Sequence, residues 1–172
     1  MSRFFPHTAY AEDQPLGHTI LLTHVLTRGI TSGTIVAATI TGVRHVVPAL
    51  RSTTAPPLPQ RLLLSASKGT LIGVGLTAAA TAARMYGRED IEWRDRSWRL
   101  LENQGQVEVD DWTYLGMGMG AAAVLANGRM RATTGWRGVV GAAGLGSVGG
   151  MIGYMGWRHG INGGKFPERK QL

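Results

Sequence analysis

The chain has 172 residues, including 25 glycines and no cysteine, and 44% of its residues are hydrophobic. Its length is enough for one domain, and the lack of cysteine excludes disulfide bonds, thiolate metal sites and cysteine nucleophiles. The formal charge of +7 suits a protein that faces anionic lipid. It suits a nucleic-acid binder less well, because the basic residues are dispersed rather than gathered on one stripe, and we expect no nucleic-acid partner.

The first sixteen residues, MSRFFPHTAYAEDQPL, form an N-terminal tail. This tail has one Arg, two acids and two prolines, which matches neither a secretory signal nor an Arg-rich, acid-poor presequence. We expect any organelle targeting signal to be internal.

Four stretches rich in Gly, Ala, Thr and Leu follow, each of about the length that crosses a bilayer. The mean hydropathy of the whole chain is only −0.01, but small residues score low on hydropathy scales and are common where transmembrane helices pack closely. We predict an all-α membrane protein of four short transmembrane helices arranged as two hairpins. The predicted spans, about 29–47, 62–86, 112–126 and 138–157, lie in a single membrane domain, 17–158.

The first span is interrupted by a charge at Arg28. A charge near the bilayer centre costs several kcal/mol, which leaves two interpretations. Either residues 17–27 form an interfacial amphipathic helix and the crossing starts at Gly29, or Arg28 faces a partner inside the membrane. We favour the first interpretation, because about 19 residues still remain and nearly span the hydrocarbon core.

The second span contains Lys68, whose long side chain can reach back to the interface at the start of the helix. Arg84 and Tyr86 mark the opposite interface. Residues 88–104 are strongly polar, and acids precede bases by four residues, a spacing that stabilises a helix. These pairs are Asp90/Arg94, Glu92/Arg96 and Asp95/Arg99. We predict an amphipathic helix in the headgroup layer, which ends at Gly105.

The last two spans form a tight hairpin with a turn at 127–136, followed by a basic tail at 159–172. Trp112, Trp136 and Trp157 lie at span boundaries, as in an aromatic belt. Asp110 and Asp111 precede Trp112 at a span entrance, where the helix dipole would stabilise them.

The connections between the spans alternate in charge. The connections 44–61 and 127–137 contain no acid, and all eleven acids lie in the two tails and the central connection. A four-pass chain places the two basic connections on one side of the membrane, in keeping with the positive-inside rule. Their basic residues are Arg44, Arg51, Arg61, Arg129, Arg131 and Arg137. Four basic residues are our candidates for headgroup contact or intramembrane charge: Arg28, Lys68, Arg129 and Arg131.

Small residues recur every four positions in all four spans. On a helix this spacing forms a smooth groove in which a neighbouring backbone can lie closely. Any single pair also arises by chance in a glycine-rich sequence, but pairs in every span favour helix packing. The pairs are Gly29/Gly33, Gly69/Gly73, Gly116/Gly120, Gly146/Gly150 and Gly149/Gly153.

Other motifs do not indicate catalysis. Gly144, Gly146 and Gly149 form a G-x-G-x-x-G sequence, but the chain ends before a βαβ unit could be completed. The five histidines show no metal-ligand spacing, and no Ser/His/Asp set is present. We expect no catalytic, cofactor-binding or metal site.

Four short small-residue spans in two hairpins, with basic connections, resemble a mitochondrial inner-membrane family. That family includes preprotein translocase channel subunits and a four-helix accessory subunit of respiratory complex I. The segment WRDRSWRLLENQGQVEVDDW also resembles small fungal membrane proteins attached to complex I. The translocase signature has Arg and Asp at a fixed spacing, whereas Arg96, Arg99, Asp110 and Asp111 have other spacings here.

The resemblance implies a multi-pass protein of the mitochondrial inner membrane, with both termini in the intermembrane space and the basic connections in the matrix. It implies a non-catalytic accessory subunit of complex I that stabilises the membrane arm of this respiratory-chain enzyme. Its partners would be membrane subunits and anionic lipid, with no cofactor other than a bound phospholipid such as cardiolipin. The alternative is a component of an inner-membrane protein translocase or a small channel, in which Arg28 and Lys68 would line a polar cavity.

Overall fold

The computed structural model describes residues 4–50 and 56–165, and within these ranges every regular element is helical. The prediction of an all-helical chain is confirmed. Arg51 and the end of the basic C-terminal tail lie outside the described residues. The helices are α1 (Gly17–Val46), α2 (Leu58–Met85), α3 (Asp90–Glu102), α4 (Gln104–Ala126) and α5 (Gly128–Met155), with short helical turns η1 (Ala11–Asp13), η2 (Pro48–Leu50) and η3 (Gly156–Ile161).

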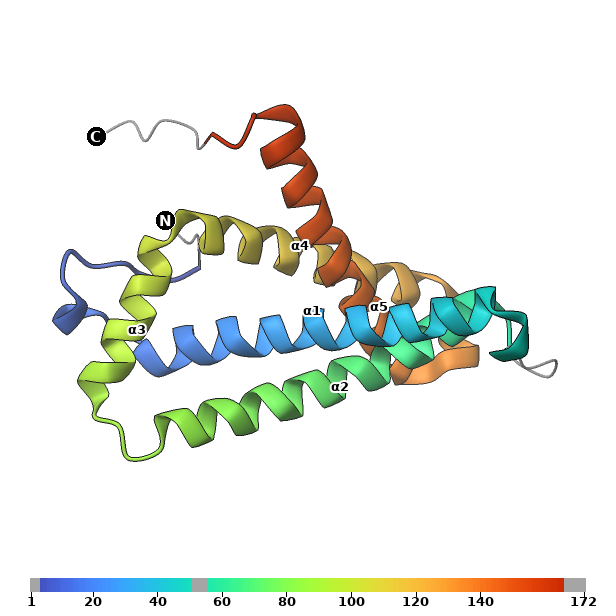
Figure 1. Ribbon diagram of the computed structural model, residues 1–172, viewed down its shortest axis with the longest axis horizontal. Helices are drawn as coiled ribbons and strands as arrows, with labels where there is room; N and C mark the ends of the chain where they lie inside the picture. The colour runs from blue at the N-terminus through green and yellow to red at the C-terminus, as the bar shows by residue number, and fades with distance from the viewer. Residues whose placement is uncertain (1–3, 51–55, 166–172) are drawn as a thin grey trace.

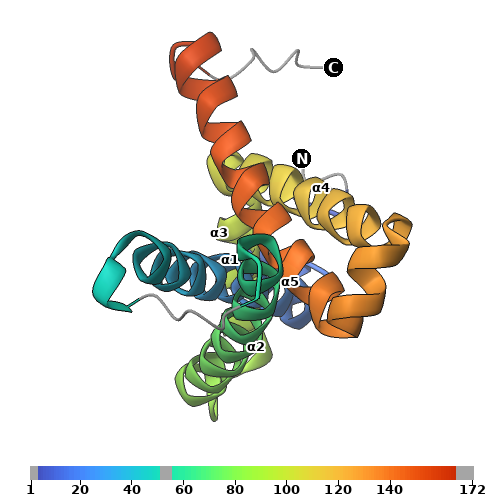
Figure 2. The ribbon, with the colours of Figure 1, turned by 90° about the vertical axis from the view of Figure 1, so that its right-hand side faces the viewer.

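The helices pack as two pairs joined by one crossing. α1 and α2 lie side by side, and α4 packs against α5 (Figure 1). α5 also contacts α2 and α1, and the view from one end shows it between α4 and the other pair (Figure 2). α3 runs across the end of the α1/α2 pair and packs on the start of α1, where Gly17 lies against the backbone of Arg94.

The first helix begins earlier than the sequence predicted. α1 is continuous from Gly17 to Val46, so residues 17–27 are not a separate interfacial helix and no break precedes Gly29. The chain enters α1 through Leu16, whose φ of 58° is left-handed. Arg28 therefore lies well inside a long helix rather than at the end of a short one.

The polar helix ends at Asn103 and not at Gly105. The Asn103 side chain accepts a hydrogen bond from the Gln106 backbone N–H at 3.2 Å, so it caps the start of the next helix. α4 therefore begins at Gln104, and the predicted span at 112–126 is only its C-terminal part. Asp110 lies beyond the first turn of α4, where the helix dipole does not account for its position.

Two of the three expected acid–base pairs of α3 are formed. Arg94 lies 2.6 Å from Asp90, and Arg99 lies 3.0 Å from Asp95. The third carboxylate, Glu92, pairs instead with Arg88, at 3.2 Å. Glu92 also accepts from the backbone N–H of Glu89 in a capping box, which draws its side chain back over the start of the helix.

The connection between α4 and α5 is a single residue, Asn127, and most of the turn predicted at 127–136 is helical. The helix is broken at Gly135, whose φ of 59° and ψ of −151° are accessible almost only to glycine. Beyond this break α5 runs to Met155, close to the predicted span at 138–157, and continues as the π-helical turn η3.

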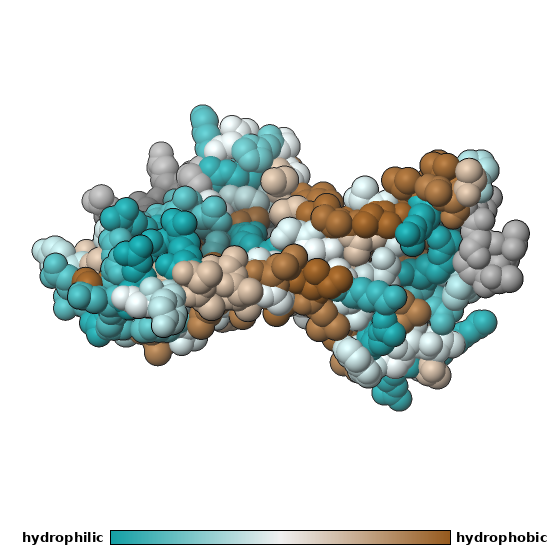
Figure 3. All heavy atoms as spheres, turned by 60° about the horizontal axis from the view of Figure 1, so that its bottom comes forward, coloured by the Kyte–Doolittle hydropathy of each residue, from teal (hydrophilic) through white to brown (hydrophobic). Residues whose placement is uncertain are grey.

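The packing differs from that of a water-soluble bundle. Many buried side chains are small or hydroxyl-bearing and only two small apolar clusters are buried, around Ile20 and Leu63, whereas many branched apolar side chains face outward. An apolar band separates two hydrophilic ends of the molecule (Figure 3). The buried set includes Thr27, Thr31, Thr34, Ser67, Thr70, Thr113 and Ser147, and the exposed set includes Ile35, Val36, Ile40, Leu71, Ile72, Leu76, Leu115, Met119 and Ile152.

Among the described residues, three helices are long and apolar enough to cross a membrane: Gly17–Val46, Leu58–Met85 and Gly128–Ile161. They are consistent with a membrane protein. α4 is not among them, since its N-terminal half carries Glu108, Asp110 and Asp111. The fourth crossing that the sequence predicted therefore stays a prediction.

Candidate functional site

A cluster of charged side chains lies between α1 and α4. Asp110 is only 8% exposed, and its two carboxylate oxygens have different partners. Nη2 of Arg28 donates to Oδ1 at 2.5 Å, and Nδ1 of His24 lies 2.5 Å from Oδ2. Arg28 also approaches Oε1 of Gln106, at 3.5 Å. The charge that interrupts the first span is therefore paired inside the helix bundle.

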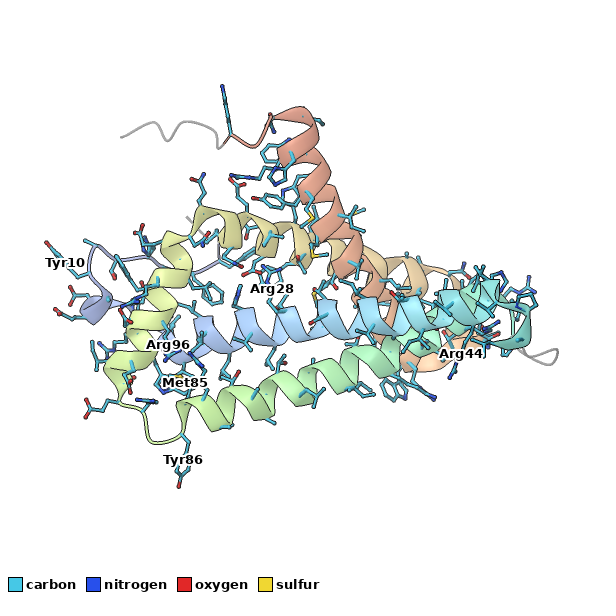
Figure 4. The ribbon with its side chains drawn as sticks, viewed as in Figure 1. Tyr10, Arg28, Arg44, Met85, Tyr86 and Arg96 are labelled. Atoms are coloured by element: carbon cyan, nitrogen blue, oxygen red, sulfur yellow. The ribbon has the colours of Figure 1, made fainter. Side chains whose placement is uncertain are left out.

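The elements place these groups by simple helical spacing. His24 and Arg28 are four residues apart, so both side chains leave the same face of α1. Asp110 comes from the facing side of α4, and Figure 4 shows Arg28 directed from α1 toward α4. Arg28 and His24 are 27% and 14% exposed, so the cluster is largely shielded from solvent. Such a pair holds two helices in one register.

The sequence singled out Arg28 and Asp110 separately, but it missed that they pair and it assigned His24 no role. The spacing between His24 and Arg28 was the available signal. Its partner could not be inferred, because the contact joins residues separated by 82 positions in the chain.

The structure brings the predicted helix-packing glycines of α1 and α2 together. A Cβ built on Gly33 would collide with the backbone of Gly69, and one on Gly73 would collide with the backbone of Gly29. The two backbones are therefore in direct contact along one turn of each helix. Only glycine, whose side chain is a single hydrogen atom, lets two helix backbones lie this close together.

The glycines of the second pair have the same arrangement. A Cβ on Gly116 would strike the carbonyl of Gly146, and a Cβ on Gly120 would strike the carbonyl of Ala142. Gly150 packs on the backbone of Trp112, and Gly153 lies under its ring. Nine of the ten glycines in the predicted pairs thus contact a neighbouring helix of this same chain, whereas Gly149 faces open space and its predicted pairing with Gly153 forms no helix contact.

A third crossing, between α5 and the α1/α2 pair, was not predicted. Gly141 lies against the backbone of Leu63, and Gly144 lies over a hydrogen bond between the hydroxyls of Thr34 and Thr70, at 2.9 Å. Nearby, the Thr31 hydroxyl donates to that of Ser147 at 3.1 Å. The recurrence of threonine along one face of α1, at 27, 31, 34 and 41, was the missed signal.

The other three candidate basic residues, Lys68, Arg129 and Arg131, lie apart from the charged cluster of His24, Arg28 and Asp110. Lys68 lines a groove of about 400 Å³ between α1 and α2. Arg129 and Arg131 are exposed near the start of α5. Arg44 lies at the opposite end of the molecule from Tyr10, Tyr86 and Arg96 (Figure 4).

A second ion pair joins α4 to the turn after α5. Nη1 of Arg158 lies 3.6 Å from Oε2 of Glu108, and the Arg158 guanidinium lies 6.0 Å from the ring centre of Tyr154. The rings of Trp112 and Trp157 are adjacent, with centroids 5.9 Å apart. These contacts hold the ends of α4 and α5 together. Among the described residues, no group of three His, Cys, Asp or Glu side chains is arranged to hold a metal ion.

The search of curated proteins finds no match to this chain. A family described as protein of unknown function (DUF1757) matches residues 11–161. This range runs from η1 to the end of η3, so it includes both helix pairs, the charged cluster and the groove. The chain belongs to the DUF1757 family.

Proposed function

We propose that this protein is a non-catalytic structural subunit of a membrane complex, built to hold helices in a fixed arrangement. The observation that carries the proposal is the distribution of side chains. Small and hydroxyl-bearing side chains make up much of the interior, while Ile72, Leu76 and similar residues face outward where lipid or partner helices would cover them.

The charged cluster supports a structural role. Both carboxylate oxygens of Asp110 contact side chains of α1, so these charged groups hold α1 and α4 together. A subunit of this kind contributes a rigid surface to its neighbours. We expect its partners to be other membrane subunits and anionic lipid.

The specific complex that we propose is respiratory complex I of the mitochondrial inner membrane. The proposal rests on the resemblance of the two-hairpin layout and of the central polar segment to accessory subunits of that complex. Both termini would then face the intermembrane space, and α4 would be the fourth crossing.

Two experiments test the proposal in order. Alkaline carbonate extraction should leave the protein in the membrane pellet, because several helices are embedded; release into the supernatant would contradict embedding. Blue-native electrophoresis followed by mass spectrometry of the tagged protein should then find it in the band of complex I. Its presence only with protein import components would contradict the complex I assignment.

The alternative is a component of a protein translocase or a small channel. One observation favours it: Arg28 and His24 retain partial exposure beside Asp110, as a charge near a polar path would. The two functions differ in the effect of Arg28→Gln on intact membranes. A transport defect with normal subunit abundance would favour the alternative, whereas loss of assembled complex with unchanged import would favour the structural subunit.

A further inference from the structure

We propose that the groove between α1 and α2 binds one anionic phospholipid of the bilayer, with its phosphate at Lys68 and one acyl chain along the apolar wall. The inference rests on the membrane embedding in the proposed function and adds to it a ligand and a defined site. It does not depend on which complex the protein joins.

The groove has the shape of a chain-binding slot. Its volume is about 400 Å³, and its floor lies where Gly33 and Gly69 bring the two backbones into contact. Its walls are the exposed side chains of Val36, Ile72 and Leu76. An apolar slot of this kind, open toward the hydrocarbon, is filled by a methylene chain without the loss of any polar contact.

Its length matches one leaflet. The lining residues of α2 run from Ser65 to Thr77, which at the helical rise of about 1.5 Å per residue is roughly 18 Å. Half of a typical hydrocarbon core is roughly 15 Å. A single acyl chain that lies parallel to α2 would therefore occupy the groove along most of its length.

The charge of the groove identifies the headgroup. Lys68 is the only charged residue in the lining, and its ammonium has no ion-pair partner among the described residues. It lies toward the same end of the helix pair as Arg44 and Arg61, where the chain is basic. A flexible lysine inside a span directs its ammonium toward the nearer interface, where lipid phosphates lie. A lipid phosphate with a net negative charge would form an ion pair with the Lys68 ammonium there.

A lipid fits this groove better than a partner helix does. The glycines at its floor are already in contact with each other, so they cannot also admit a third backbone. A partner helix would need an acidic side chain placed opposite Lys68, as α4 supplies Asp110 to Arg28, and it would have to pack on the apolar walls at the same time. An anionic phospholipid places its phosphate at the interface, near Lys68, and has a flexible acyl chain that fits the apolar groove.

The test uses the full-length protein, purified in detergent and exposed to an equal mixture of phosphatidylglycerol and phosphatidylcholine with identical chains. Native mass spectrometry counts the lipids retained. We expect the wild-type protein to retain the anionic lipid about fivefold more than the zwitterionic one. Lys68→Gln should abolish this preference, and Lys68→Arg should keep it. Val36→Trp, which fills the slot, should reduce retention of both lipids while Lys68 is intact.

Arg99→Gln is the control, because it removes one exposed cation on α3, outside the groove. Unchanged preference in Lys68→Gln, or an equal loss in Arg99→Gln, would overturn the site. A photoreactive residue in place of Ile72 should cross-link to lipid in native membranes, and a cross-link to another protein would overturn the lipid in favour of a partner helix. Release of the wild-type protein by carbonate would overturn both this inference and the proposed function, whereas loss of lipid preference with retention in the membrane pellet concerns the groove alone.

Discussion

At the scale of single residues, the contact between Arg28 and Asp110 has the clearest consequence. Asp110 is nearly buried, so a variant that removes Arg28 leaves the negative charge of the Asp110 carboxylate without its positively charged partner. We expect Arg28→Gln to lower the free energy of unfolding by about 1.5–3 kcal/mol, the range for hydrogen bonds to charged groups. The measurement is thermal unfolding in detergent, monitored by circular dichroism.

The control for this prediction is Arg88→Gln, which breaks an exposed pair with Glu92 on α3. Exposed pairs of this kind contribute at most about 1 kcal/mol, so the control should unfold almost as the wild type does. Asp110→Asn should also cost less in the Arg28→Gln background than alone, because the buried charge is then removed. Equal effects of Arg28→Gln and Arg88→Gln would show that the contact with Asp110 adds no stability.

Gly135 is a second position with a residue-scale consequence. Its φ of 59° and ψ of −151° place it in a region that costs other residues about 1–3 kcal/mol. We expect Gly135→Ala to lower the free energy of unfolding by that amount, as measured by chemical denaturation in detergent. Gly128→Ala serves as the control, since Gly128 lies in the first turn of α5 with nothing within 4 Å of a built Cβ. A destabilisation by Gly128→Ala that equals that of Gly135→Ala would rule out the backbone explanation.

At the scale of helices, the glycine contacts predict which substitutions separate the two members of a pair. Leucine at Gly33 would collide with backbone that cannot move aside, so α1 and α2 must part. Leucine at Gly42, on the same helix, meets nothing within 4 Å. We expect Gly33→Leu to cost about 1–3 kcal/mol or more and Gly42→Leu to be nearly neutral, in the same unfolding measurement.

The α4/α5 pair offers an independent version of this experiment. Gly146→Leu should open that pair, because Gly146 lies on the backbone of Gly116, whereas Gly149→Leu points into open space. A cross-link between engineered cysteines at facing positions of α4 and α5 should form in the Gly149→Leu protein and fail in the Gly146→Leu protein. Equal cross-linking would mean that the glycines are not needed for the contact.

At the scale of the whole molecule, the charge distribution predicts an orientation. Tyr86 and Arg44 lie at opposite ends of the molecule, and both side chains are exposed (Figure 4). The chain has no cysteine, so Tyr86→Cys and Arg44→Cys each carry a single thiol. For the proposed location in the mitochondrial inner membrane and the proposed orientation, an impermeant thiol reagent should label Tyr86→Cys in mitoplasts directly and Arg44→Cys only after detergent is added. Labelling of both without detergent would contradict a membrane crossing between the two ends.

The helical fold followed from the sequence because it is a local property. Runs of Gly, Ala and Leu bounded by Arg, Trp and Pro indicated the helices, and the second span at 62–86 corresponds closely to Leu58–Met85. The sequence predicted less accurately those helix boundaries that depend on a single capping side chain. Asn103 starts a new helix two residues before the expected end at Gly105, because its amide satisfies an otherwise unpaired backbone N–H.

The faces that pack were also visible in the sequence, since small residues spaced by four lie on one side of a helix. Only the tertiary structure decided which faces meet. Gly33 packs on Gly69, Gly141 packs on Leu63, and Arg28 reaches Asp110, and none of these partners lies near its counterpart in the chain. A sequence specifies the period and chemistry of each helix, but the pairing of helices depends on the combined fit of every surface at once. That global fit paired the charge at Arg28 with Asp110 between two helices, whereas the sequence alone had favoured an interfacial position for it.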